Sequence, residues 1–152
     1  MPAYFFDSSA LVKFYVEESG TPWVRSLTDS AENIIHVASL ARVETISALT
    51  RRLNRQDITD AEFDEACGDL EQDFVTQYRI VALSEAIIEN AASLARKHGL
   101  RAYDAVQLST ALDVRRILAQ AESITIAFVT ADLELNAAAV AEGFSTEDPN
   151  NY

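Results

Sequence analysis

Residues 3–13 read AYFFDSSALVK, a short apolar run that ends at an aspartate followed by two serines. Short runs rich in aromatic or β-branched residues are typical of buried strands, and three more follow at 34–37, 80–83 and 124–130. Amphipathic helical patterns separate these runs. Strands that alternate with helices favour a parallel sheet with helices on both faces, so the sequence predicts an α/β fold.

The segments between the strands carry signals for helix ends. Thr59 and Glu62 have the spacing of a capping box, and Gly99 is placed to end a later helix. No repeat, linker or second domain is visible, so we expect one domain over residues 1–152. We expect the polar tail after Gly143 to be held loosely.

The composition limits the possible functions. With 49% hydrophobic residues in 152, the chain has the apolar content of a globular domain. A single cysteine, Cys67, excludes a disulfide framework and any multi-cysteine metal site. No run approaches transmembrane length, so we expect a cytoplasmic protein without a membrane partner.

The net charge of −12 disfavours nucleic-acid binding over the surface as a whole. The acids are unevenly spread, however, because the segment from Asp57 to Asp73 is densely acidic and holds no basic residue. Such a run is usually the solvated face of an amphipathic helix. The alternative is a docking face for a basic partner.

Two aspartates follow predicted strands: Asp7 comes directly after the first, and Asp132 comes after the last. In open parallel sheets, ligands bind beyond the carboxyl ends of the strands, near the switch in strand order. Both residues therefore lie where such a fold places its chemistry. The alternative for each is that it caps the helix that follows.

Two further acids lie beside the apolar stripes of helices. Glu44 is next to a stripe that includes Val43 and Ile46, and Asp104 stands one turn before Leu108. A carboxylate aimed at a core is seldom left unpaired. The alternative is a structural salt bridge, for example to an arginine.

If the four carboxylates share one site, a cation has to lie among them. Two carboxylates about 4 Å apart repel by about 4 kcal/mol in a partly buried site. Ligand sets made of oxygen alone select a hard ion such as Mg²⁺ or Mn²⁺. Near a phosphodiester, such an ion activates water and offsets the charge on phosphate.

The order of these residues resembles a known family. The four segments are DSSALVK at 7–13, ARVET at 41–45, RAYDA at 101–105 and VTAD at 129–132. In order and spacing they resemble PIN-domain ribonucleases, most closely the VapC-type toxins of bacterial toxin–antitoxin pairs. The resemblance covers nearly the whole chain.

The resemblance implies a PIN-like three-layer α/β/α sandwich and hydrolysis of RNA with Mg²⁺ or Mn²⁺. It also implies inhibition by a cognate antitoxin and assembly as a homodimer. By position, the implied catalytic acids are Asp7, Glu44, Asp104 and Asp132; the metal ligands among them are Asp7, Asp104 and Asp132; the hydroxyls that orient them are Ser8 and Thr130.

Basic residues near these acids are candidates for substrate contacts. Arg51 and Arg55 lie on the same predicted helix as Glu44 and project from it in nearly the same direction as Glu44. A phosphate backbone could therefore follow the two arginines away from the acid. Their alternative is pairing with acids of the neighbouring helix, such as Asp57. Lys13 is a third candidate for phosphate binding, with a helical pair to Glu17 as the alternative.

Two positions near the predicted site stay open. Tyr103 either stacks on a nucleobase or packs in the core. Many members of the family place an acid directly after the fourth aspartate, whereas Leu133 and Glu134 follow here, so the role of Glu134 and the number of metals are open.

The sequence leaves two alternative functions to compare with a ribonuclease. A phosphorelay receiver is disfavoured because only Asp7 follows the first strand and no lysine occurs beyond Lys97. The second alternative is a catalytically weak metal-binding module that acts through an antitoxin or another protein.

Overall fold

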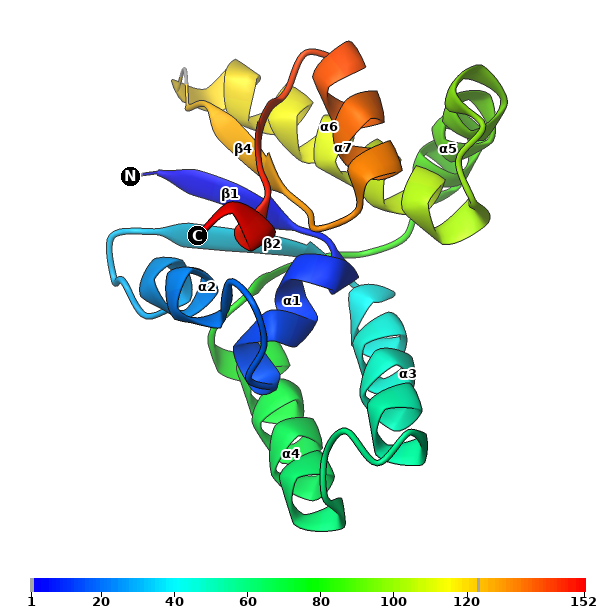
Figure 1. Cartoon of the computed structure of the whole chain (residues 1–152). Coiled ribbons are helices and arrows are strands. Elements are labelled where there is room, and N and C mark those ends of the chain that lie inside the picture. The colour runs from blue at the N-terminus through cyan, green and yellow to red at the C-terminus, as the bar shows by residue number, and fades with distance from the viewer. Residues whose placement is uncertain (1, 123) are drawn as a thin grey trace.

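The computed structural model describes residues 2–122 and 124–152. Its centre is a five-stranded sheet in the order β3-β2-β1-β4-β5, with neighbouring strands parallel. Helices lie on both faces, so the predicted three-layer α/β/α sandwich with a central parallel sheet is confirmed (Figure 1). The strands are β1 (Ala3–Phe6), β2 (Ile34–Ala38), β3 (Arg79–Val81), β4 (Ile126–Val129) and β5 (Ser145–Glu147).

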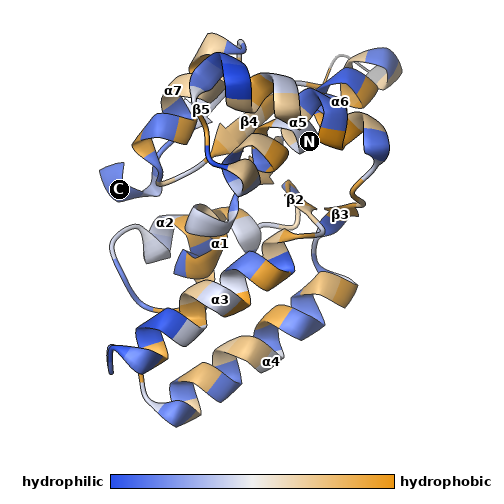
Figure 2. Cartoon of the chain, turned by 90° about the vertical axis from the view of Figure 1, so that its right-hand side faces the viewer, coloured by the Kyte–Doolittle hydropathy of each residue, from blue (hydrophilic) through white to orange (hydrophobic). Residues whose placement is uncertain are grey.

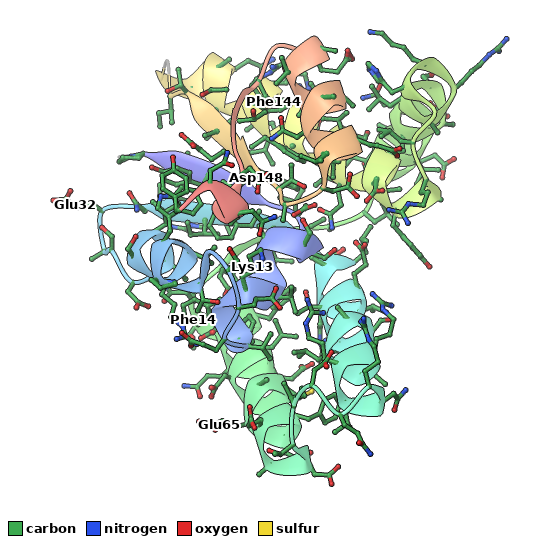
Figure 3. All side chains as sticks on the ribbon, in the orientation of Figure 1. Lys13, Phe14, Glu32, Glu65, Phe144 and Asp148 are labelled. Carbon is green, nitrogen blue, oxygen red and sulfur yellow. The ribbon has the colours of Figure 1, made fainter. Side chains whose placement is uncertain are left out.

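Alternate residues of β1 face the two helical layers. Phe5 is fully buried together with Leu108, whereas Phe6 is fully buried with Leu11 on the opposite face. In Figure 3 the labelled Phe144 and Phe14 lie in these two different layers. One layer contains α1 (Ser8–Tyr15), α2 (Thr21–Thr28), α3 (Ala41–Asn54) and α4 (Asp60–Thr76); the other contains α5 (Glu85–His98), α6 (Ala102–Glu122) and α7 (Leu133–Ala141).

The predicted helix ends are present. Thr59 accepts the N–H of Glu62 while the Glu62 carboxylate accepts the N–H of Thr59, which is a complete capping box at the start of α4. Gly99 ends α5 with a φ of 66°, a left-handed conformation that glycine adopts without steric cost. Over the described residues, no helix is both long and apolar enough to cross a membrane.

The polar tail is not held loosely, contrary to the expectation. Strand β5 pairs with β4, and the short helix η1 (Pro149–Asn151) follows it. Tyr152 then stacks on Trp23 with 4.4 Å between ring centroids. A side chain at Gly20 would come within 2.3 Å of the Pro149 carbonyl oxygen, so the tail lies directly on the start of α2. A three-residue polar strand carries no apolar pattern, and pairing with β4 decides its conformation.

Helices α3 and α4 lie side by side and extend beyond the sheet (Figure 2). The buried face of α3 consists of Ala41, Thr45, Ala48 and Leu49. Val43, which the sequence assigned to the apolar stripe, is 70% exposed. Ile46, the other residue assigned to the stripe, does pack against the core. Val43 is wrongly placed because the small side chains of α3 form the buried face beside it.

Candidate active site

The sheet topology creates a crevice at the carboxyl ends of β1 and β4. The chain leaves β1 into α1 on one face of the sheet and leaves β4 into α7 on the other. Asp7 caps α1 by accepting the N–H of Ala10 at 2.9 Å, and Asp132 caps α7 by accepting that of Leu135 at 3.0 Å. Both aspartates are therefore helix caps, and both also line the same cavity of about 660 Å³.

This cavity brings together most of the predicted site. Asp7, Asp132, Glu44 of α3 and Asp104 of α6 line it, so acids from four separate elements share one space. Thr130 lies behind the wall, fully buried against Asp7. The other predicted residues on the wall are Ser8, Lys13 and Arg51.

Asp7 is the most deeply buried of the four acids. Ser9 donates to both of its oxygens at 2.8 and 2.9 Å, and Thr130 donates to Oδ2 at 2.7 Å. Burial raises the pKa of Asp7 to about 7, against the hydrogen bonds from Thr130, Ala10 and Ser9, and the charge of Asp104 adds to the rise. Thr130, a candidate from the sequence, and Ser9, which the sequence prediction missed, thus both donate hydrogen bonds to Asp7.

Glu44 is held by two donors. The Gln107 side chain donates to Oε1 at 2.7 Å, and Ser8 donates to Oε2 at 3.2 Å. Burial raises the pKa of Glu44, the two hydrogen bonds oppose the rise, and the charge of Asp104 adds to it. Ser8 therefore orients Glu44. Gln107 was missed, although a polar residue one turn after Asp104 on a buried face was a signal for it.

Asp104 and Asp132 share a cation from the chain itself. The Arg101 guanidinium lies 3.4 Å from Oδ2 of Asp104 through Nε and 3.3 Å from Oδ2 of Asp132 through Nη2. Burial raises the pKa of Asp104, as does the charge of Asp132, whereas Arg101 opposes the rise. Glu134 is exposed, and its charge also raises the pKa of Asp104. The alternative given for Asp104, a salt bridge to an arginine, is therefore present, and it lies within the cavity.

The basic residues divide into those that reach the cavity and those that do not. Arg51 is exposed and lines the cavity. Arg55 is absent from the lining and lies 3.9 Å from Asp57, as the alternative interpretation had it. Tyr103 is 65% exposed on the cavity wall, so its alternative as a core residue is wrong.

Lys13 lies in a buried polar cluster at the edge of the cavity. It donates to Glu18 at 3.3 Å and to the carbonyl oxygen of Ser19 at 2.8 Å. The alternative given for Lys13, a helical pair with Glu17, is wrong, since Lys13 pairs with Glu18 and Glu17 pairs with Arg25. Arg52, missed in the sequence, also lines the cavity and pairs with Glu18 at 3.1 Å. Glu18 thus neutralises part of the positive charge of this wall.

The chemistry of the cavity suits a hard divalent cation. Its acidic ligands are carboxylates alone, and the pKa values of Asp7, Glu44 and Asp104 are each raised in part by a neighbouring carboxylate. Among the residues that the structure describes, no three His, Cys, Asp or Glu side chains form a group that could hold an ion as they stand. The donors are thus of the right kind and line one cavity.

The chain is similar to known proteins in both sequence and fold. Residues 4–141 match the family model of the PIN domain. Ribonuclease VapC45 of Mycobacterium tuberculosis is 37% identical over 114 residues, which cover 75% of this chain and 78% of that protein. The Sarcin-Ricin loop cleaving toxin VapC20 of Mycobacterium tuberculosis superimposes with a TM-score of 0.64 at 16% identity, over 93% of this chain and 95% of that one. VapBC2 from Rickettsia felis, bound to a DNA fragment from its promoter, superimposes with a TM-score of 0.61 at 12% identity, over 96% of this chain and 98% of that one.

Proposed function

Because the chain belongs to the PIN-domain family, we propose that it is a VapC-type ribonuclease that hydrolyses RNA with the help of Mg²⁺ or Mn²⁺. The observation that carries the proposal is the convergence of four carboxylates, from α3, α6 and the caps of α1 and α7, on one cavity. The 37% identity to a protein named as a ribonuclease supports the same reaction.

We assign the acids different roles. Asp7, Asp104 and Asp132 hold the cation, which when bound polarises the phosphate and makes water a better nucleophile. Ser9 and Thr130 fix the orientation of the Asp7 carboxylate. Glu44 orients the attacking water and accepts its proton. We place that proton on Oε2, because the hydrogen bond from Ser8 to this oxygen, at 3.2 Å, is the longer of the two that Glu44 accepts.

The walls of the cavity provide contacts for an RNA strand. Arg51 and Arg52 of α3 lie beside the acids and offer guanidinium groups for phosphate. Tyr103 presents an exposed ring on which an unpaired base can stack. Lys13 reinforces the positive charge of the wall and stays bound to Glu18, whereas Arg55 lies outside the cavity.

We further propose that residues 1–152 form one domain, that the chain assembles as a homodimer, and that a cognate antitoxin inhibits it. The antitoxin proposal is supported by the fold shared with the VapBC2 complex. The exposed acidic face of α4 offers charge complementarity to a basic segment of such a partner.

The test compares two aspartates of the same helix. Asp104 lines the cavity and pairs with an arginine three residues before it, whereas Asp113 pairs with Arg116 three residues after it and does not line the cavity. With Mn²⁺ and a panel of RNAs, we expect Asp104→Asn to reduce cleavage by about 100-fold or more and Asp113→Asn to leave it unchanged. EDTA should abolish the wild-type activity. Cleavage that survives EDTA or Asp104→Asn contradicts the mechanism.

One observation favours a second candidate function. The carboxylates are already hydrogen-bonded or paired, and within the described part of the chain they form no ready-made ion site. This suits a weakly catalytic module that acts mainly through a protein partner. A wild-type chain that binds Mn²⁺ and a small basic protein but cleaves no RNA of the panel would support it over the ribonuclease.

A further inference from the structure

Arg101 occupies two of the oxygen atoms that the proposed ion site needs. Its guanidinium lies 3.4 Å from Oδ2 of Asp104 and 3.3 Å from Oδ2 of Asp132. The other oxygen of Asp132 accepts the N–H of Leu135 in the cap of α7. The oxygen that Asp132 has free for a cation is therefore the one that Arg101 holds.

Arg101 also lies where two cavities meet. It lines the acidic cavity together with Asp104, and it lines a second, more open cavity together with Leu133 and Glu134. Asp132 is likewise shared by the two. A guanidinium at this position separates the acids from the neighbouring surface.

The position of Arg101 is fixed only weakly. Its side chain is 80% exposed, in contrast to 21% for Asp104 and 24% for Asp132. Exposed ion pairs contribute little free energy, because solvent screens the charges and the long side chain loses conformational freedom. A divalent cation binding the same oxygens would repel the guanidinium and displace it into solvent or into the second cavity.

We propose that Arg101 is a built-in competitor of the divalent cation: its guanidinium neutralises Asp104 and Asp132 and has to leave them before the ion can bind both. The inference rests on the proposed function, since it assumes that these two aspartates are ion ligands. A displaced Arg101 stays beside the site, where its guanidinium can pair with a substrate phosphate. One residue thus serves as counter-ion first and as anion ligand afterwards.

The test measures Mn²⁺ binding directly, without RNA, by isothermal titration calorimetry. The variants are Arg101→Gln and Arg101→Lys, and the control is Arg116→Gln. Arg116 is also exposed and also pairs with an aspartate three residues away on α6, at 2.8 Å, but it lies outside both cavities. We expect Arg101→Gln to bind Mn²⁺ about three- to tenfold more tightly than the wild type, Arg101→Lys to fall between them, and Arg116→Gln to match the wild type.

The possible outcomes separate this inference from the proposed function. Equal or weaker binding by Arg101→Gln, with wild-type binding that depends on Asp7, overturns the competition and leaves the ribonuclease proposal intact. Wild-type protein that binds no Mn²⁺ overturns both. Thermal unfolding followed by circular dichroism verifies that each variant is folded. If Arg101→Gln does not fold, Mn²⁺ binding by Arg101→Lys, which keeps the charge, is compared with binding by the wild type instead.

Discussion

Replacing Asp7 with asparagine should stabilise the protein at pH 8 but not at pH 5. Burial raises the pKa of Asp7 from 3.8 to about 7, so the folded protein keeps a proton there that the unfolded chain releases. The shift corresponds to about 4 kcal/mol of folding free energy. That stability is fully present below pH 3.8 and is lost as the pH rises through about 7.

The asparagine variant keeps this stability at all pH values because its side chain does not ionise. Its amide nitrogen, however, cannot accept the hydrogen bonds that Ser9 and Thr130 donate to Oδ2 of Asp7. Each lost bond costs about 1 kcal/mol. We therefore expect the Asp7→Asn variant and the wild type to be about equally stable at pH 5, and the variant to be more stable by about 2 kcal/mol at pH 8.

Urea unfolding followed by circular dichroism, in EDTA, measures this difference at both pH values. Asp148→Asn is the matched control. Like Asp7, Asp148 caps a helix, since it accepts the N–H of Asn150 at the start of η1, but this hydrogen bond is exposed to solvent. The control separates the effect of a changed cap from the effect of burial. A difference between Asp7→Asn and wild type that is the same at pH 5 and pH 8 would refute the reasoning.

Three further predictions concern the walls of the cavity and the tail. Arg51→Ala should raise the KM for RNA about tenfold in steady-state cleavage, whereas Arg55→Ala, which changes a residue outside the cavity, should leave the KM unchanged. Equal effects of the two substitutions would show that the cavity lining does not determine which arginine binds RNA. Gln107→Leu removes the donor to Oε1 of Glu44 and should lower kcat about tenfold with little change in KM, measured in the same assay; an unchanged kcat would rule out its positioning role. Removing residues 144–152 uncovers the edge of β4 and should promote aggregation, detected by light scattering; a stable, monodisperse truncated protein would contradict the importance of β5.

The fold could be predicted because its signals are local. Three of the four apolar runs mark buried strands. The run at 80–83, also expected to be buried, instead contains β3, the edge strand of the described sheet, where Ile80 is 40% exposed because β3 has a neighbour on one side only. Asp7 directly follows β1 and Asp132 lies shortly after β4, so acids at the carboxyl ends of the strands can be predicted from the sequence. Strand β5 has no such pattern, since its conformation depends on pairing with β4. Val43 was misassigned because several registers of α3 offer an apolar face, and only packing selects one.

The site could be predicted in its acids but not in the groups that hold them. Glu44 and Asp104 stand out in the sequence because a carboxylate beside the apolar stripe of a helix is costly to bury unless it has a partner. Ser9, Gln107 and Arg52 have ordinary sequence positions, and their importance appears only when α1, α3 and α6 are placed against one another. The contact of Arg101 with Asp132 depends on where β4 ends, which the position of Arg101 in the sequence does not reveal.

The order of strands has a consequence during synthesis on the ribosome. Strand β1 is made first, yet it lies between β2 and β4, and Asp7 receives its hydrogen bond from Thr130 and shares its cavity with Asp132. An emerging polypeptide therefore lacks a complete acidic centre until the chain has been translated at least as far as Asp132. Unfinished chains would be harmless to the RNA around them, including the message and ribosome from which they are produced.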